Sequence, residues 1–143
     1  MYKHYSYWKS SLKAMAHNFK NLLIWQKSMD LTDITFVYCE SLPSSERFNL
    51  KDQINRSACS IPSNIAEGSG KRTKPQFAEY LSIALSSAYE LETQLLICER
   101  RNYGINEKLV QALTLLTEIQ KMIFSYREGI FSQMRAKDKT FVS

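Results

Sequence analysis

Four polar residues at helical spacing are the first group in this sequence whose side chains could do chemistry together. They are separated by 4, 4 and 3 positions and would form one ridge of a helix: Arg56, Ser60, Asn64 and Glu67. Acid–base catalysis would need a second carboxyl group near Glu67, and the nearest acid upstream is Asp52. We therefore expect structural contacts of this ridge, within a subunit or between subunits. A catalytic cleft that uses Glu67, Arg56 and Asn64 is the weaker alternative.

Histidine is missing from the body of the chain, since His4 and His17 both precede Asn18. The body therefore lacks the Glu-x-x-His pairs of di-metal helical bundles, and also Ser–His and Cys–His nucleophile pairs. No glycine-rich phosphate loop of the GxGxxG or Walker type occurs either. The sequence predicts a protein that is not an enzyme, with no catalytic residues, no metal and no cofactor.

Basic residues form the second group. The chain has 19 Lys and Arg against 14 Asp and Glu, a net charge of +5. Many of the basic residues fall in three segments: Lys3, Lys9, Lys13 and Lys20; Lys71, Arg72 and Lys74; Arg127, Arg135, Lys137 and Lys139. Clustered basic side chains bind polyanions by releasing their condensed counterions. The residues expected to contact phosphates of RNA or DNA, with little sequence preference, are Lys20, Lys71, Arg72, Lys74 and Arg127.

Apolar periodicity predicts the helices that position these side chains. The first helix is expected within 22–41, with an apolar face made of Leu22, Trp25, Met29, Ile34 and Val37. The second runs from about 49 to 68, with a core stripe made of Leu50, Ile54, Ala58, Ile61 and Ile65. The third covers about 75–101 and the fourth runs from about 106 past Tyr126, both with apolar residues spaced three and four apart. Two such helices favour long, nearly antiparallel partners.

These helices predict an all-α fold, an antiparallel up-down-up-down four-helix bundle, and 4 Gly and 3 Pro are too few for a turn-rich β protein. In this topology the start of the first helix, the loop after Gly68-Ser69-Gly70 and the C-terminus share one end, which should be basic. We divide the chain into a basic aromatic N-terminal arm (1–17), the bundle (18–131) and a basic C-terminal tail (132–143). Residues 1–17 are either a real basic arm, or Met15 was the start of an ancestral, shorter reading frame. The sequence leaves both alternatives open.

Two further expectations concern location and assembly. The three cysteines are far apart and form no CxxC pair, no signal peptide is visible, and no apolar run could span a membrane, so a cytoplasmic protein is expected. Several apolar residues lie outside the main stripes and favour oligomerisation if they remain exposed: Tyr38, Phe48, Tyr80, Tyr89, Leu96, Leu115 and Met122.

One segment, Gln53 to Gly68, carries a family resemblance through its string Ser-Ile-Pro-Ser-Asn-Ile-Ala-Glu-Gly. It resembles the signature of the four-helix-bundle proteins encoded in intervening sequences of bacterial 23S ribosomal RNA genes. Further matches are Phe19 to Leu22, Trp25-Gln26, Phe77 to Leu81 and Glu90 to Gln94, so that the resemblance covers about residues 18–130.

The resemblance implies a four-helix protomer that assembles as a homopentameric ring. Related accessory variability proteins of diversity-generating retroelements bind nucleic acid and partner a reverse transcriptase, which would apply here only if the chain is encoded in a retroelement. We therefore expect an assembly protein that binds RNA or DNA through its basic end, with no membrane partner. The alternative is a protein-interaction scaffold.

Overall fold

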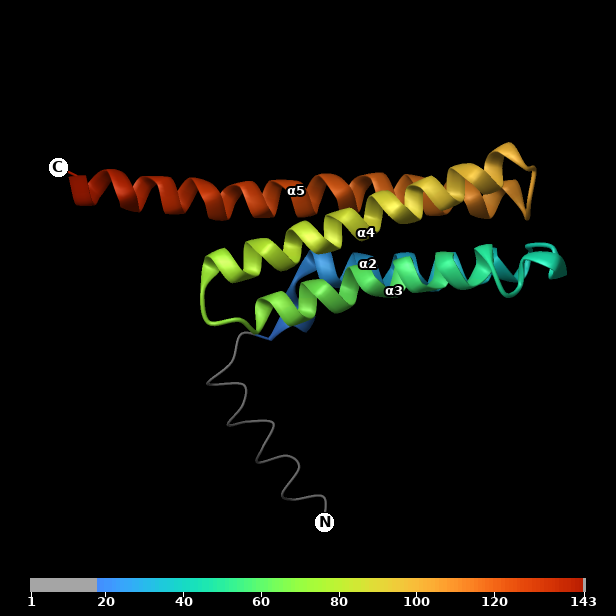
Figure 1. Ribbon diagram of the computed structural model, residues 1–143, viewed down its shortest axis with the longest axis horizontal. Coiled ribbons are helices and arrows are strands. Elements are labelled where there is room, and N and C mark those ends of the chain that lie inside the picture. Colours follow the sequence, from blue (N-terminus) through green and yellow to red (C-terminus); the bar gives the residue numbers. More distant parts are fainter. Residues whose placement is uncertain (1–17, 143) are drawn as a thin grey trace, which may run out of the picture.

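The computed structural model describes residues 18–142 of the chain, and its regular structure is entirely helical (Figure 1). The elements are the short 3-10 turns η1 (Phe19–Asn21) and η2 (Ser44–Glu46) and the helices α2 (Leu23–Glu40), α3 (Leu50–Ser69), α4 (Lys74–Arg100) and α5 (Asn106–Val142). The prediction of an all-α chain with four helices and no strands is confirmed for these residues. Lys3, Lys9 and Lys13 of the expected basic end lie outside the described residues.

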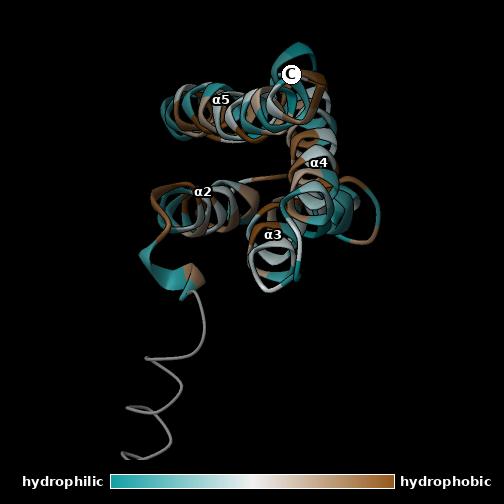
Figure 2. Cartoon of the chain, turned by 90° about the vertical axis from the view of Figure 1, so that its left-hand side faces the viewer, coloured by the Kyte–Doolittle hydropathy of each residue, from teal (hydrophilic) through white to brown (hydrophobic). Residues whose placement is uncertain are grey.

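Each of the four helices packs against two others: α2 against α3 and α5, and α4 against α3 and α5. Seen end-on, they stand at the corners of a quadrilateral (Figure 2). Successive helices run in opposite directions in Figure 1, so the start of α2 and the α3–α4 loop both lie toward its left side.

The expected core stripes of α3, α4 and α5 are buried. In α3 every member of the stripe from Leu50 to Ile65 is at most 8% exposed. In α4 and α5 the stripes from Phe77 to Cys98 and from Leu109 to Ile130 are buried apart from Tyr126, which is half-buried. The Tyr126 ring packs edge-on against Phe77, with 5.5 Å between ring centroids.

The face predicted for α2 was only partly right, since Leu22, Trp25 and Ile34 are half-buried and pack against the core. The buried residues are Ile24, Ser28, Leu31, Thr35, Tyr38 and Cys39, whereas Met29 and Val37 are 40% and 44% exposed. Two of these buried residues, Ser28 and Thr35, are polar, so the core-facing side of α2 cannot be recognised from the spacing of apolar residues alone. The Ser28 hydroxyl donates to the Ile24 carbonyl oxygen at 2.6 Å, but the Thr35 hydroxyl has no hydrogen-bond partner among the described residues.

The prediction that Tyr38 lies outside the core was wrong. Its side chain is fully buried and its hydroxyl donates to the Tyr103 carbonyl oxygen at 2.7 Å. The α4–α5 turn covers the ring, and a Cβ on Gly104 would lie 2.7 Å from Tyr38 Cε2. Of the other residues in that group, Phe48, Tyr89 and Leu96 are exposed, while Tyr80, Leu115 and Met122 are half-buried.

Pro62 lies inside α3 without ending it. A proline at this position removes the backbone donor for the Ala58 carbonyl oxygen, four residues earlier. The Thr32 hydroxyl of α2 lies 3.4 Å from that oxygen. The gap in the hydrogen bonding of α3 therefore coincides with the place where α2 approaches it.

The last segment of the chain continues a helix. Residues 132–142, expected as a tail, belong to α5, which has 37 residues and is therefore about 55 Å long. Its C-terminal end projects past the other helices (Figure 1). Phe131 and Met134 still pack against the core, whereas Phe141 and Val142 are at least 90% exposed.

Candidate functional site

Four of the five residues predicted to bind phosphate are exposed where α2 begins and α3 connects to α4. Lys20 belongs to η1, Lys71 and Arg72 to the α3–α4 loop, and Lys74 is the first residue of α4. None of the four forms a salt bridge with a residue in the described range. We call these four residues the basic end.

The local structure of the loop explains how the basic end is held. The Thr73 side chain caps α4 by accepting a hydrogen bond from the Gln76 backbone N–H at 3.3 Å. The first turn of α4 contains no acidic residue. The Lys71 ammonium group lies 5.0 Å from the centroid of the Tyr80 ring, a favourable cation–π arrangement. These contacts fix the course of the loop and leave the basic side chains in solvent.

Arg127, the fifth predicted residue, has a different environment. Its side chain is only 19% exposed and donates from Nη1 to the Ser82 hydroxyl of α4 at 3.2 Å. The guanidinium carbon also lies 5.4 Å from the centroid of the Phe124 ring. Arg127 therefore contacts α4 across the α4–α5 interface, and the structure does not present it to solvent as it does the basic end.

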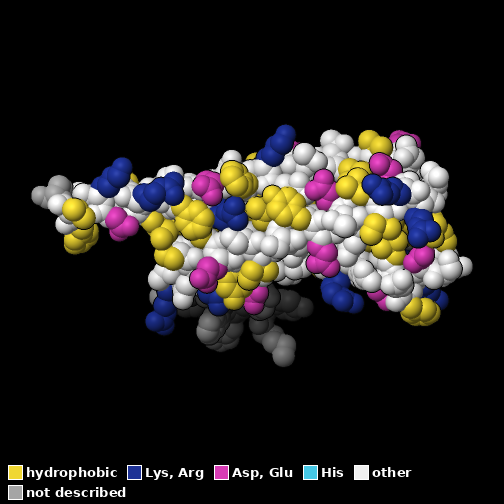
Figure 3. Space-filling model, turned by 45° about the horizontal axis from the view of Figure 1, so that its top comes forward, with side chains coloured by type: hydrophobic (Ala, Val, Ile, Leu, Met, Phe, Trp, Pro, Cys, Tyr) yellow, Lys and Arg dark blue, Asp and Glu magenta, His cyan; other side chains and the backbone are white. Residues whose placement is uncertain are grey.

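The projecting end of α5 carries exposed side chains of both signs. Arg135, Lys137 and Lys139 are exposed, and Asp138 lies among them. Figure 3 shows basic and acidic side chains together on this narrow projection. A polyanion would therefore meet a weaker positive potential here than the three basic residues alone imply.

The polar ridge predicted on α3 is divided between an interface and the surface. The Ser60 hydroxyl lies 2.8 Å from the Ser87 hydroxyl of α4, and Asn64 donates to the Ser60 hydroxyl at 3.0 Å. Arg56 and Glu67 are exposed and make no side-chain hydrogen bond or salt bridge to a described residue. Ser60 and Asn64 thus contribute polar contacts where α3 meets α4.

A second polar contact in the α3–α4 interface was missed by the sequence analysis. The buried Ser57 hydroxyl donates to Gln94 Oε1 at 2.7 Å, and Gln94 Nε2 donates to Glu90 at 3.2 Å. The sequence does contain a sign of this contact, because Ser87 and Gln94 are seven residues apart and therefore lie on the same side of α4.

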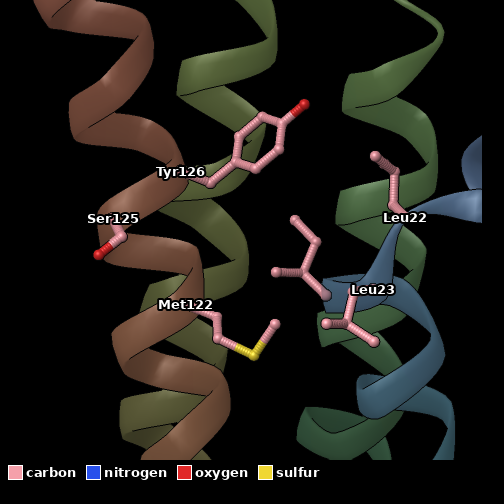
Figure 4. Close-up of a pocket in the computed structure, with 6 residues that line it drawn as sticks. Leu22, Leu23, Met122, Ser125 and Tyr126 are labelled. Carbon is pink, nitrogen blue, oxygen red and sulfur yellow. The ribbon is translucent and has the colours of Figure 1, made fainter.

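The molecule also has an apolar groove of about 410 Å³ between the start of α2 and the middle of α5. Figure 4 shows Leu22 and Leu23 facing Met122 and Tyr126, while Ser125 points away from them. Among residues 18–142, no carboxylate, imidazole or thiol lines this groove. Its lining therefore offers no pair of groups for acid–base or nucleophilic chemistry.

No three His, Cys, Asp or Glu side chains among residues 18–142 are grouped so that they could hold a metal ion. Within the same range, every helix is too short or too polar to cross a membrane.

Comparisons with known proteins give a consistent result. A family model described as "23S rRNA-intervening sequence protein" matches residues 20–125. The chain is also similar to the crystal structure of a protein with unknown function from the S23 ribosomal protein family of Bacteroides thetaiotaomicron. The two are 29% identical with a TM-score of 0.67, over 73% of this chain and 98% of that one. No curated protein matches.

Proposed function

Because the chain belongs to the 23S rRNA-intervening sequence protein family, we propose that it is a non-enzymatic helical assembly protein that binds RNA or DNA through its basic end. One observation carries this proposal. Lys20, Lys71, Arg72 and Lys74 are exposed at one end of the bundle and lack salt bridges to described residues. Basic side chains without an acidic partner are available to replace the counterions of a phosphate backbone.

Charged side chains, rather than helix dipoles, would supply most of the attraction. The N-terminus of α4 attracts anions, but the C-terminus of α3 lies beside it and opposes that field. Contacts made in this way do not read base edges, so the proposal predicts little sequence preference. The same proposal places the protein in the cytoplasm.

Assembly would strengthen this binding. Exposed apolar residues recur at helical spacing on α4 (Tyr89 and Leu96, seven apart) and on α5 (Val110 and Phe124, fourteen apart). Such residues support a homo-oligomer of up-down-up-down bundles, and the family likeness favours a pentameric ring. Each copy would add one basic end, which raises avidity without a new kind of contact. Light scattering should give five times the subunit mass of 16.6 kDa, and a monomer would contradict the ring.

Reversing the charge of the loop should abolish most binding. We expect the triple variant Lys71→Glu, Arg72→Glu and Lys74→Glu to bind more weakly. The slope of log Kd against the logarithm of the salt concentration should fall by about two to three per protomer, as expected for three lost phosphate contacts. The measurement is a fluorescence anisotropy titration with labelled single- and double-stranded RNA and DNA at several salt concentrations.

The matched control carries the same charge change at the other end of the bundle: Arg100→Glu, Arg101→Glu and Lys108→Glu. These residues lie at or near the α4–α5 turn. We expect this variant to keep the salt dependence of the wild type apart from a small effect of net charge. Equal losses in the two triple variants, or no binding by the wild type at low salt, would contradict the proposal.

A protein-interaction scaffold is the second candidate function, and the apolar groove between α2 and α5 favours it. Under this alternative the loop variant would still capture its protein partner. Substituting Leu23→Asp in the groove would abolish capture. The two candidate functions therefore depend on different residues.

A further inference from the structure

Helix α2 carries a second apolar stripe that the bundle leaves partly uncovered. Its members lie outside the buried face of α2 and are spaced 4, 3 and 4 apart: Trp25, Met29, Thr32 and Phe36. Trp25 and Thr32 are half-buried, while Met29 and Phe36 are 40% and 42% exposed. We call these four residues the outer stripe. It lies away from α5, because Lys27, which forms the salt bridge to α5, is on the opposite side of α2.

The outer stripe follows the interface between α2 and α3. The Thr32 hydroxyl lies 3.4 Å from the Ala58 carbonyl oxygen of α3, and the next residue, Cys59, is exposed. Asn55 is one turn earlier on α3, and its side-chain oxygen is buried with no hydrogen-bond partner among the described residues. A partner on this surface would therefore cover apolar side chains and could supply a donor to this acceptor.

Acidic residues border the outer stripe. Those with exposed side chains are Asp33 and Glu40 on α2 and Asp52 on α3, while a neighbouring base on α3, Lys51, is half-buried. Asp33 lies four residues after Met29, and Glu40 lies four after Phe36, so both are next to the stripe on the helix surface. The surface therefore suits an apolar partner that carries positive charge.

The projecting end of α5, residues 132–142, has both of these properties. Its core-facing side continues past the bundle, because Met134 packs against the core and Phe141, seven residues later, is 95% exposed. Three of its four charged residues are basic: Arg135, Lys137, Lys139 and Asp138. A helical segment gains most of its stability by packing its apolar side, so the uncovered side of this segment indicates a contact with another surface.

The projecting end extends away from the outer stripe of its own chain. It follows the axis of α5 beyond the other helices, whereas the outer stripe lies where α2 meets α3 (Figure 1). A second copy of the chain can present its outer stripe there. Pairing of two projecting ends would bring like charges together, and the apolar groove has Lys20 and Lys121 beside it. Charge therefore favours the outer stripe over these two alternatives.

We propose that the projecting end of one copy packs on the outer stripe of a second copy. Residues 134–142 rise about 12 Å, which fits within the rise of about 16 Å along the outer stripe. The two surfaces differ, so each copy uses one of each, and repetition of this contact gives a ring where the rotation closes. The inference rests on the assembly that we propose above, but not on the binding of nucleic acid, since neither surface includes the basic end. The projecting end also lies outside residues 20–125, which the family model matches.

Reversing the charges on each surface tests the proposal in the full chain. We expect Arg135→Glu with Lys137→Glu, and in a second chain Asp33→Lys with Glu40→Lys, to raise the dissociation constant of the oligomer about tenfold. All four side chains are exposed, so the variants should fold. A chain with all four substitutions should recover most of the association, because opposite charges face each other again. Light scattering over a dilution series measures the dissociation constants.

The outcomes separate this contact from assembly in general. A monomeric wild type would overturn both the assembly and this inference. Unchanged association in the two double variants, or no recovery in the quadruple variant, would overturn this contact while the assembly through other surfaces stands.

The native thiol of Cys59 allows a second measurement. Asp138→Cys places a thiol on the side of the projecting end that carries Met134, while Ala136→Cys places one on the opposite side. Cys39 and Cys98 are buried, and burial raises the pKa of the Cys39 thiol to about 12 and also raises that of Cys98. These two thiols therefore do not compete under mild oxidation.

We expect Asp138→Cys to form disulfides with Cys59 of another copy about tenfold faster than Ala136→Cys does, as judged by non-reducing gels and peptide mass mapping. Equal rates in the two variants would overturn the proposal. Disulfides that join only the two substituted positions would overturn it too, since the projecting ends would then pair with each other.

Discussion

Gly68→Ala should lower the free energy of unfolding by about 2–3 kcal/mol, although alanine is the better helix former. Gly68 lies inside α3 where it meets α4. A Cβ at this position would lie 2.5 Å from Tyr80 Cβ and 2.9 Å from Phe77 Cδ2. Because the nearest atom is the first carbon of a side chain, rotamer changes cannot relieve the contact, and the two helices would have to separate. Urea denaturation at one protein concentration measures the loss.

Gly129→Ala is the matched control, since Gly129 also lies inside a helix, α5, but a Cβ there would meet no atom within 4 Å. Only the helix propensity changes at this site, so the variant should be more stable by about 0.5–1 kcal/mol. The same substitution therefore has opposite signs at the two sites. If Gly→Ala changed the stability in the same direction at both positions, close packing of α3 on α4 would not explain why position 68 requires glycine.

Tyr38→Ala should cost about 3–5 kcal/mol, the usual range for removing a large aromatic side chain from a core. The ring is fully buried and its hydroxyl binds the Tyr103 carbonyl oxygen in the turn before α5. Tyr38→Phe separates the two contributions, because it keeps the ring and loses only the hydrogen bond, at a cost of about 1–3 kcal/mol. Thermal and urea denaturation of both variants measure these losses.

Phe48→Ala is the comparison for Tyr38, because the sequence pattern placed both residues outside the main stripes. Phe48 is 83% exposed. Its loss should change the stability of the isolated protein by less than about 0.5 kcal/mol. A large loss at Phe48, or a negligible one at Tyr38→Ala, would show that the two side chains have been assigned to the wrong environments.

Most of the fold could be predicted because three helices bury unbroken apolar stripes. In α4, for example, Leu81, Ala88 and Leu95 repeat at intervals of seven and are fully buried. Helix α2 could not be oriented in this way, because Ser28 and Thr35 occupy its buried line. A serine whose hydroxyl donates to the backbone of its own helix can be buried in a core. A prediction based only on the spacing of apolar residues places such a serine on the exposed side.

The candidate site could be predicted only where exposure follows from chain connectivity. Lys71 and Arg72 lie in a short loop between long helices, so their position at the end of the bundle follows from the order of elements. Arg127 lies within a helix, and its environment depends on how α5 is rotated against α4. Gln94 was missed for the same reason, because its partner Ser57 lies on another helix.

The contact between α2 and α5 has a consequence for how cooperatively the chain folds. It joins residues far apart in sequence, such as Lys27 and Glu118, which are 91 positions apart and form a salt bridge. Helices α3 and α4, by contrast, are joined by a loop of only a few residues. Closing the longer loop costs about 2–3 kcal/mol more chain entropy than closing the short one. The α2–α5 contact is therefore stable only when the other three interfaces already hold these two helices close together. The four helices should gain or lose their structure in a single transition.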